Sequence, residues 1–201
     1  MTDPGEMKIA YCGAAGAYAF LASSQRFPGA ALHGFPGFRE AYRAVVDGIC
    51  DAAVLPLENS TAGAVEEVQL LLDAGSLVIS QTIELPIRHC LLANPGAQLS
   101  EIRTVCSHPQ ALRQCAGFLR TLGVSLRDAV STASAAKALR ESGSRTEAVI
   151  ASGEAAALYG LTILHQDIQD CAENATRFAV ITKAPAEGEQ GHDHIRPRAR
   201  P

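Results

Sequence analysis

Residues 77–93 read LVISQTIELPIRHCLLA, and this stretch decides how the chain is divided. Pro86 separates two extended stretches, 77–85 and 88–93, which predict either a long crossing strand or a hairpin. Short apolar runs alternate with helical patterns on both sides of it. We therefore interpret residues 77–93 as the bridge between two α/β lobes.

The chain before this bridge has a β-α-β-α-β order. Short apolar runs at 8–12, 31–35 and 51–55 predict strands, and the spacing of apolar residues between them predicts helices. This order is typical of a mostly parallel sheet covered by helices.

The same rhythm resumes after the bridge. Strands are predicted at 104–107, 125–130, 148–151 and 177–183, and helices at 110–122, 131–141 and 154–159. From residue 185 onward Gly, Pro, Glu, His and Arg replace apolar residues, so 185–201 is predicted to be a disordered tail.

Composition narrows the classes of function. The formal net charge is -4 without a dense basic patch, so we expect no nucleic-acid partner. The sequence has no run of about 18 apolar residues and no signal-like N-terminus, so we expect a cytoplasmic protein that does not bind a membrane. His192 and His194 could bind a stray metal ion, but a solvated tail explains them better, and no Asp or Cys spacing indicates a zinc site or a catalytic triad.

Two polar or glycine-rich segments join a predicted strand to a helix in the first half. Residues 13–16 read GAAG, which lets the backbone approach a ligand and places a helix N-terminus nearby, although a plain tight turn explains it equally well. Residues 56–63 read PLENSTAG and contain more polar side chains than a helix cap needs. Ligands of parallel sheets lie beyond such strand ends, so the second segment is a candidate binding site.

Two further segments follow the bridge. Ser107 and His108 begin the run SHPQAL, where His108 suggests acid–base chemistry or a structural role beside a helix cap. Residues 174–178 read NATRF and enter the last strand. A guanidinium at the start of an apolar strand either points outward or binds an anion, and Arg177 suits a carboxylate.

Together these segments resemble the prephenate dehydratase family. The matching runs, in family order, are GAAGAY at 13–18, LPLENS at 55–60 with Gly63, SHPQAL at 107–112 with QC at 114–115, STA at 131–133, IAS at 150–152, YGL at 159–161 and TRF at 176–178. The TRF and SHPQAL runs are specific, whereas the glycine turn is not.

The resemblance implies a fold similar to type 2 periplasmic binding proteins: an α/β protein of two doubly wound lobes with the active site in the cleft. The catalytic domain would span residues 8–184, with lobe 1 at about 8–83 plus 176–184 and lobe 2 at about 84–175. The implied activity is the conversion of prephenate to phenylpyruvate, without a cofactor or metal, by a homodimer or homotetramer.

The resemblance also implies roles for residues. Thr176 would donate to the departing hydroxyl, and Arg177 would hold a carboxylate beside it. The implied substrate-binding residues are Ala15, Glu58, Asn59, Ser60, Ser107, Gln110, Thr132, Asn174 and Phe178.

This sequence departs from the family pattern in two ways. Ala19 stands where members often carry a serine, and no regulatory ACT domain follows, so we expect no phenylalanine feedback through such a domain. Arogenate dehydratases share these motifs, and non-aromatising prephenate decarboxylases are related, so both remain alternatives. A binding module without turnover is the alternative from another class.

Overall fold

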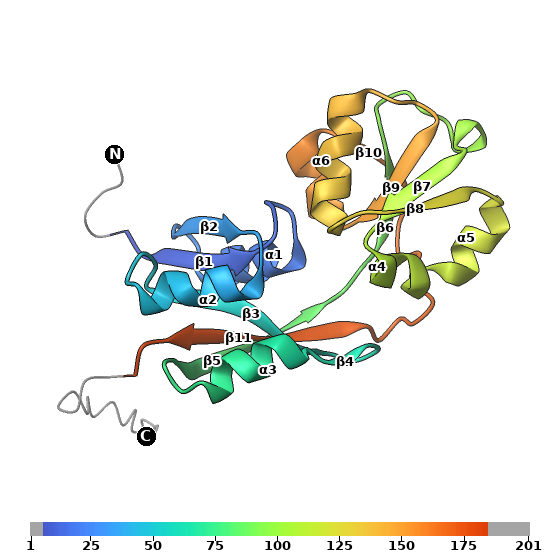
Figure 1. Cartoon of the computed structure of the whole chain (residues 1–201). Coiled ribbons are helices and arrows are strands. Elements are labelled where there is room, and N and C mark those ends of the chain that lie inside the picture. The colour runs from blue at the N-terminus through green and yellow to red at the C-terminus, as the bar shows by residue number, and fades with distance from the viewer. Residues whose placement is uncertain (1–5, 185–201) are drawn as a thin grey trace, which may run out of the picture.

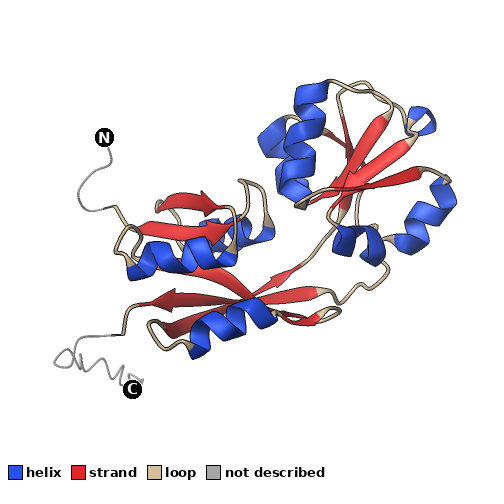
Figure 2. Ribbon diagram, viewed as in Figure 1, coloured by secondary structure: helices blue, strands red, loops and turns tan. Residues whose placement is uncertain are grey.

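A computed structural model of the chain describes residues 6–184, which form two α/β lobes joined by two connections (Figure 1). Each lobe has one sheet with helices on its faces (Figure 2). The predicted two-lobed α/β class is therefore confirmed. The predicted tail at 185–201 lies outside the described residues. No helix of residues 6–184 has the length and apolar content needed to span a membrane.

Lobe 1 is built from both ends of the described chain. Its sheet has the order β2-β1-β3-β11-β5, and the short β4 pairs with β3. Its elements are β1 (Lys8–Cys12), α1 (Tyr18–Arg26), β2 (Ala31–Phe35), α2 (Phe38–Val46), β3 (Ala52–Asn59), β4 (Gly63–Ala64), α3 (Glu66–Asp73), β5 (Val78–Pro86) and β11 (Ala175–Thr182).

Lobe 2 is one continuous segment. Its sheet has the order β10-β6-β9-β7-β8. Its elements are β6 (Cys90–Ala93), the 3-10 helix η1 (Leu99–Glu101), β7 (Thr104–Ser107), α4 (Pro109–Gln114), α5 (Ala116–Leu122), β8 (Ser125–Asp128), α6 (Thr132–Ser142), β9 (Glu147–Ala151), α7 (Gly153–Tyr159) and β10 (Thr162–His165).

The three strands of the predicted β-α-β-α-β unit are parallel, which confirms that expectation, but each complete sheet is mixed. β1 is parallel to β2 and β3, but β11 is antiparallel to both of its neighbours, β3 and β5. The connectivity requires this, because β5 leads from lobe 1 toward lobe 2 and β11 leads back. In lobe 2, β6 is likewise antiparallel to both of its neighbours.

The bridge is a crossing and not a hairpin, because β5 and β6 belong to different sheets. β5 continues to Pro86, three residues beyond the expected end of this lobe at residue 83. The returning segment lies beside it, and the Ile87 N–H donates to the Asn174 carbonyl at 2.8 Å. The two connections therefore share hydrogen bonds instead of passing independently between the lobes.

The lobe 1 sheet is buried on both faces. Ala10 of β1 belongs to one apolar cluster together with α2 and α3, whereas Ile9 and Tyr11 belong to another together with α1. Successive side chains of a strand point to opposite faces, so burial of both faces explains the continuous apolar run of β1.

The lobes also touch at the glycine turn before α1. Tyr159, at the end of α7, donates to the Ala15 carbonyl at 2.7 Å, and the Ser152 hydroxyl donates to the Gly16 carbonyl at 3.2 Å. Gly16 has φ +85°, and a Cβ atom there would lie 3.3 Å from the Cβ atom of Ala155. A glycine is required at this position both for its backbone conformation and for the approach of α7.

A pair of glycine substitutions measures this contact. Gly16 and Gly29 have φ values of +85° and +86°, but a Cβ atom at Gly29 would have no neighbour within 4 Å. Gly29→Ala therefore adds backbone strain alone, about 1–3 kcal/mol. Gly16→Ala also crowds the buried Ala155, and we expect about 1 kcal/mol or more of additional loss in the free energy of unfolding. Equal losses in denaturant unfolding would contradict this contact.

Candidate active site

A cavity of about 270 Å³ lies between the lobes, and both lobes contribute to its wall. Lobe 1 supplies residues from the start of α1 and from the facing strands β3 and β11. Lobe 2 supplies the turns that follow β7 and β8, and the crossing segment adds two residues. The lining residues are Cys12, Gly13, Ala17, Tyr18, Ala19, Phe38, Pro56, Asn59, Ile87, His89, His108, Gln110, Ala111, Gln114, Val130, Ser131, Thr132, Thr176 and Phe178.

Five residues implied by the resemblance lie in this wall. They are Asn59, Gln110, Thr132, Thr176 and Phe178. Ala19 also lines the cavity, so the hydroxyl that is missing at this position would have faced the same space.

The strand geometry explains how the lobe 1 residues meet. Thr176 and Phe178 are two positions apart on β11 and therefore share a face. β11 pairs with β3 at Thr176–Asn59 and Phe178–Pro56, with a shift in register between these pairs. This bulge leaves one additional residue in β3, and Asn59 and Pro56 both line the cavity although they are three positions apart.

Hydrogen bonds to Asn59 fix the orientation of its amide. The backbone N–H groups of Thr61 and Ala62 each donate to Asn59 Oδ1 at 3.0 Å. The nitrogen Nδ2 consequently faces β11, where Thr176 Oγ1 at 2.9 Å, the Ala175 carbonyl at 3.0 Å and Asn174 Oδ1 at 2.7 Å share its two hydrogens. Because the Thr176 oxygen accepts from Nδ2, the hydroxyl proton of Thr176 is free to point into the cavity.

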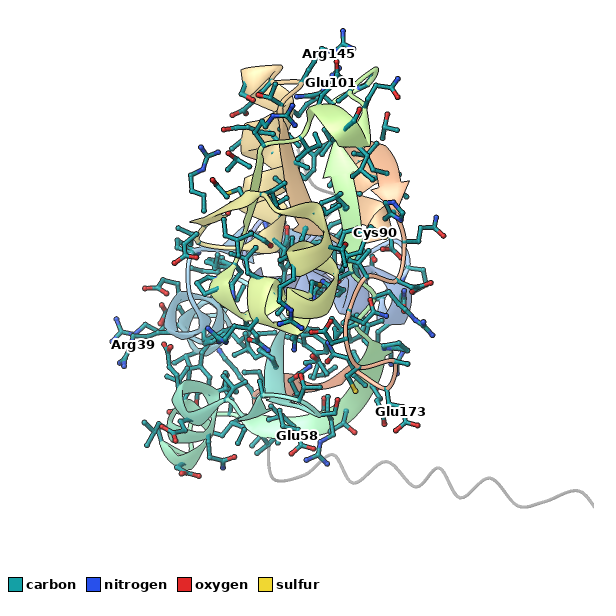
Figure 3. The ribbon with its side chains drawn as sticks, turned by 90° about the vertical axis from the view of Figure 1, so that its right-hand side faces the viewer. Arg39, Glu58, Cys90, Glu101, Arg145 and Glu173 are labelled. Atoms are coloured by element: carbon teal, nitrogen blue, oxygen red, sulfur yellow. The ribbon has the colours of Figure 1, made fainter. Side chains whose placement is uncertain are left out.

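Arg177 does not lie in the cavity, contrary to the expectation that it holds a carboxylate beside Thr176. As the residue between two cavity-facing positions of a strand, it projects to the opposite face. Its guanidinium forms an ion pair with Glu58 at 3.1 Å, and both side chains are about half exposed. Glu58 therefore also lies outside the cavity, on the lobe 1 surface at the bottom of Figure 3.

Four other expected binding residues do not line the cavity and form hydrogen bonds within the protein. Ser107 is fully buried and donates to the Ile150 carbonyl at 2.7 Å. The Ser60 hydroxyl accepts from the Ala175 N–H at 3.0 Å, which ties β3 to the start of β11. Asn174 accepts from Asn59 Nδ2 at 2.7 Å, and the Ala15 carbonyl accepts from Tyr159.

Among the cavity residues without a role assigned from the sequence, Tyr18, His89 and Gln114 are joined by hydrogen bonds. His89 Nε2 lies 3.0 Å from Gln114 Oε1, and Nδ1 lies 3.0 Å from the Tyr18 hydroxyl. Gln114 Nε2 in turn donates to Thr61 Oγ1 at 2.6 Å. Tyr18 and Gln114 stand within the quoted family runs. His89 stands in none of them, and its mostly apolar neighbours in the sequence gave no sign of a binding site.

His108 presents a donor to the cavity. Its Nδ1 accepts from the Gln110 N–H at 3.2 Å, so the proton of the neutral ring is on Nε2. Burial and then the nearby charge of Arg113 lower the pKa of His108, although Asp128 opposes this shift. We therefore expect His108 to be neutral near pH 7 and to act as a hydrogen-bond donor.

The partial positive charges that face the cavity come from backbone N–H groups at the starts of helices. None of the described lining residues is Lys, Arg, Asp or Glu. α1 and α6 both begin at the cavity, and Ala17, the N-cap of α1, offers no side-chain acceptor to the first N–H groups. Such N–H groups attract anions. Within residues 6–184 no cluster of three or more His, Cys, Asp or Glu could hold a metal ion.

Comparisons with known proteins match this arrangement over nearly the whole described chain. "Arogenate dehydratase/prephenate dehydratase 1, chloroplastic" of Arabidopsis thaliana is 40% identical over 183 residues, which are 91% of this chain and 47% of that protein. The "Bifunctional N-acyl-homoserine lactone acylase/prephenate dehydratase" of Komagataeibacter europaeus is 37% identical over 90% of this chain and 65% of that protein. This chain thus spans about half the length of the plant relatives it matches.

A solved structure gives the same result. The prephenate dehydratase of Arthrobacter aurescens in complex with L-Phe superposes with a TM-score of 0.83 at 27% identity, and the match covers 90% of this chain and 61% of that chain. The family model described as "Prephenate dehydratase" matches residues 9–186. The chain, with its cavity between two α/β lobes, therefore belongs to the prephenate dehydratase family.

Proposed function

We propose that this chain converts prephenate to phenylpyruvate, a step in aromatic amino-acid biosynthesis. The observation that carries this proposal is the bond from Asn59 Nδ2 to Thr176 Oγ1 at 2.9 Å, because a Thr176 oxygen that accepts here leaves its own proton free to point into the cavity that Thr176 lines. The departing group of prephenate is a hydroxyl, so a donor at this place meets the main chemical need of the reaction.

The reaction breaks two bonds that join substituents to the ring. The bond to the ring carboxylate breaks, and its electron pair enters the ring as the carbon–oxygen bond to the hydroxyl breaks. Prephenate dianion and one proton give phenylpyruvate anion, carbon dioxide and water, and the ring becomes aromatic. Thr176 donates a hydrogen bond to the departing oxygen, and Asn59 stabilises the negative charge that this bond induces on the Thr176 oxygen.

Helix ends supply the contacts for the two carboxylates of prephenate. The uncapped first turn of α1 lies at the cavity in lobe 1. In lobe 2 the Ser131 side chain already accepts from the Ser134 N–H at the start of α6, so the Thr132 hydroxyl is the donor offered there. His108 Nε2–H and Gln110 add neutral donors from lobe 2. Neutral donors suit the ring carboxylate, because a tight ion pair would stabilise the charge that must leave as carbon dioxide. Phe178 would pack against the ring.

The alternatives differ in product and substrate. Arogenate carries an ammonium group, and the absence of Asp and Glu from the described cavity wall favours prephenate. A non-aromatising decarboxylase keeps the hydroxyl and has less need for the Thr176 donor. Incubation with prephenate and, separately, arogenate separates these alternatives by the ultraviolet spectrum and mass of the product. An acyl-homoserine lactone should also be tested as a substrate, because one relative is named both an N-acyl-homoserine lactone acylase and a prephenate dehydratase.

We also propose that the protein acts in the cytoplasm as a homodimer or homotetramer. The family resemblance supports this assembly, and light scattering during size-exclusion chromatography measures it.

Substitution of Thr176 tests the donor. We expect Thr176→Ala to lower kcat by at least about 10²-fold, the usual loss when one donor to a developing negative charge is removed. Thr176→Ser keeps the hydroxyl and is the matched control, with most of the activity retained. Thermal melts verify that both variants fold. Near wild-type kinetics for the alanine variant would remove Thr176 from its role.

Substitution of the Glu58–Arg177 pair tests whether Arg177 touches the substrate. We expect Glu58→Gln and Arg177→Gln to change kcat and KM only slightly, because neither residue lines the cavity. We also expect both variants to remain folded, because an exposed ion pair contributes about 0–1 kcal/mol to stability. The measurement is KM and kcat for prephenate. A KM that rises about 100-fold in Arg177→Gln alone would mean that Arg177 binds a carboxylate after the lobes rearrange.

A further inference from the structure

His89 lies where the chain enters lobe 2, immediately before β6, and only 2% of its surface is exposed. Its main chain is fixed on both sides: its N–H donates to Gln169 Oε1 at 2.9 Å, and its carbonyl accepts from the Ile168 N–H at 3.0 Å. The ring reaches Tyr18 of lobe 1 and Gln114 of lobe 2 and lines the cavity between them.

The position of the His89 proton follows from a chain of donors that begins at the backbone. Asn59 Oδ1 accepts from two backbone N–H groups and is therefore an oxygen. The Thr61 hydroxyl lies 2.7 Å from that oxygen, so it must donate its single proton there. The oxygen of Thr61 then has to accept from any further partner.

That further partner is the amide of Gln114, 2.6 Å from Thr61 Oγ1. The end of the amide that faces Thr61 must be the nitrogen, which leaves its oxygen facing His89. An amide oxygen only accepts, so His89 Nε2 carries a hydrogen and donates it across 3.0 Å.

The contact with Gln114 requires a proton on Nε2 of His89, whatever the state of Nδ1. Tyr18 has one proton and lies 2.7 Å from the Arg88 carbonyl and 3.0 Å from Nδ1, so in the neutral ring Nδ1 accepts only when Tyr18 turns its proton from the Arg88 carbonyl to Nδ1. Burial lowers the pKa of His89, although the bond to Gln114 opposes the shift, so the neutral ring is favoured. With the proton on Nδ1 instead, the Nε2 lone pair would face the Gln114 oxygen and the amide would turn over. Thr61 would then donate to Gln114, and Asn59 Oδ1 would lose the Thr61 hydroxyl as a donor.

We propose that His89 is a positioning residue for the dehydration, and this inference rests on the proposed function. By donating from Nε2 to Gln114 Oε1, it holds Gln114 and Thr61 in the arrangement in which the Thr61 hydroxyl joins the two backbone N–H groups as a donor to Asn59 Oδ1. Asn59 then donates to the Thr176 oxygen, so an imidazole in the crossing segment strengthens the arrangement that directs the Thr176 proton, without touching the reacting atoms.

Two amide substitutions separate the two edges of the ring. Gln places an amide nitrogen near the site of Nε2, so His89→Gln retains a donor for Gln114. Asn reaches only the site of Nδ1, so His89→Asn retains the contact with Tyr18 and loses Gln114. We expect kcat to fall by about 10-fold or more in His89→Asn and by no more than about 3-fold in His89→Gln, with similar KM values.

The free energy of unfolding of the two variants shows whether His89 has only a structural role. Both variants bury one neutral amide at the same site, so unfolding in denaturant measures whether their folding differs. Equal kcat values for the two variants, whether both retained or both lost, would overturn the assignment. So would a loss of kcat that follows a loss of stability.

A spectroscopic measurement decides the question independently of turnover. Nitrogen-15 spectra of the wild-type imidazole are expected to show a protonated Nε2 and an unprotonated Nδ1 for His89. The Gln114 side-chain amide signals are expected to shift in His89→Asn and to stay near their wild-type positions in His89→Gln. A His89 ring without a proton on Nε2 would overturn the proposal even in a protein that turns over prephenate. A protein that shows the expected spectra but does not consume prephenate would contradict only the proposed function.

Discussion

The bond from the Asn59 amide to the Thr176 hydroxyl is the interaction on which the proposed chemistry depends. A threonine hydroxyl has one proton, and its direction decides whether the residue helps the reaction or only completes the protein's own hydrogen bonds. Asn59 stands at the end of β3 opposite Thr176 of β11, so the pairing of these strands sets the chemistry directly. Two backbone donors of the following turn and the Thr61 hydroxyl together set the orientation of the amide.

Two sets of contacts hold the lobes together around the cavity. The crossing segments are hydrogen-bonded to each other, and a second contact at the glycine turn joins α1 to α7. The cavity therefore lies between two places where the lobes touch. The residues at 150–161 that match the family have a structural explanation in this second contact, since Ser152 caps α7 and also bonds to Gly16.

The sequence was sufficient to predict the two-lobed class, the bridge, most strands and the cavity residues that lie at strand ends. It did not reveal that Arg177 lies outside the described cavity wall and pairs with Glu58, because adjacent strand residues point to opposite faces. Within a strand, the TRF run necessarily places Thr176 and Phe178 on one face and Arg177 on the other. The bulge in β3 and the mixed sheets depend on long-range pairing, which local patterns do not encode. His89 stands in an apolar run, and only the fold brings Tyr18 and Gln114 to it.

The most direct test of the account is the turnover of Asn59→Asp. The two side chains have nearly the same shape, but a carboxylate accepts where the amide donates, so the Thr176 proton would turn from the cavity toward residue 59. The account predicts that kcat for prephenate falls by at least about 10²-fold while the variant remains folded. A folded Asn59→Asp variant with near wild-type kcat would contradict it, because the direction of the Thr176 proton would then not control the reaction.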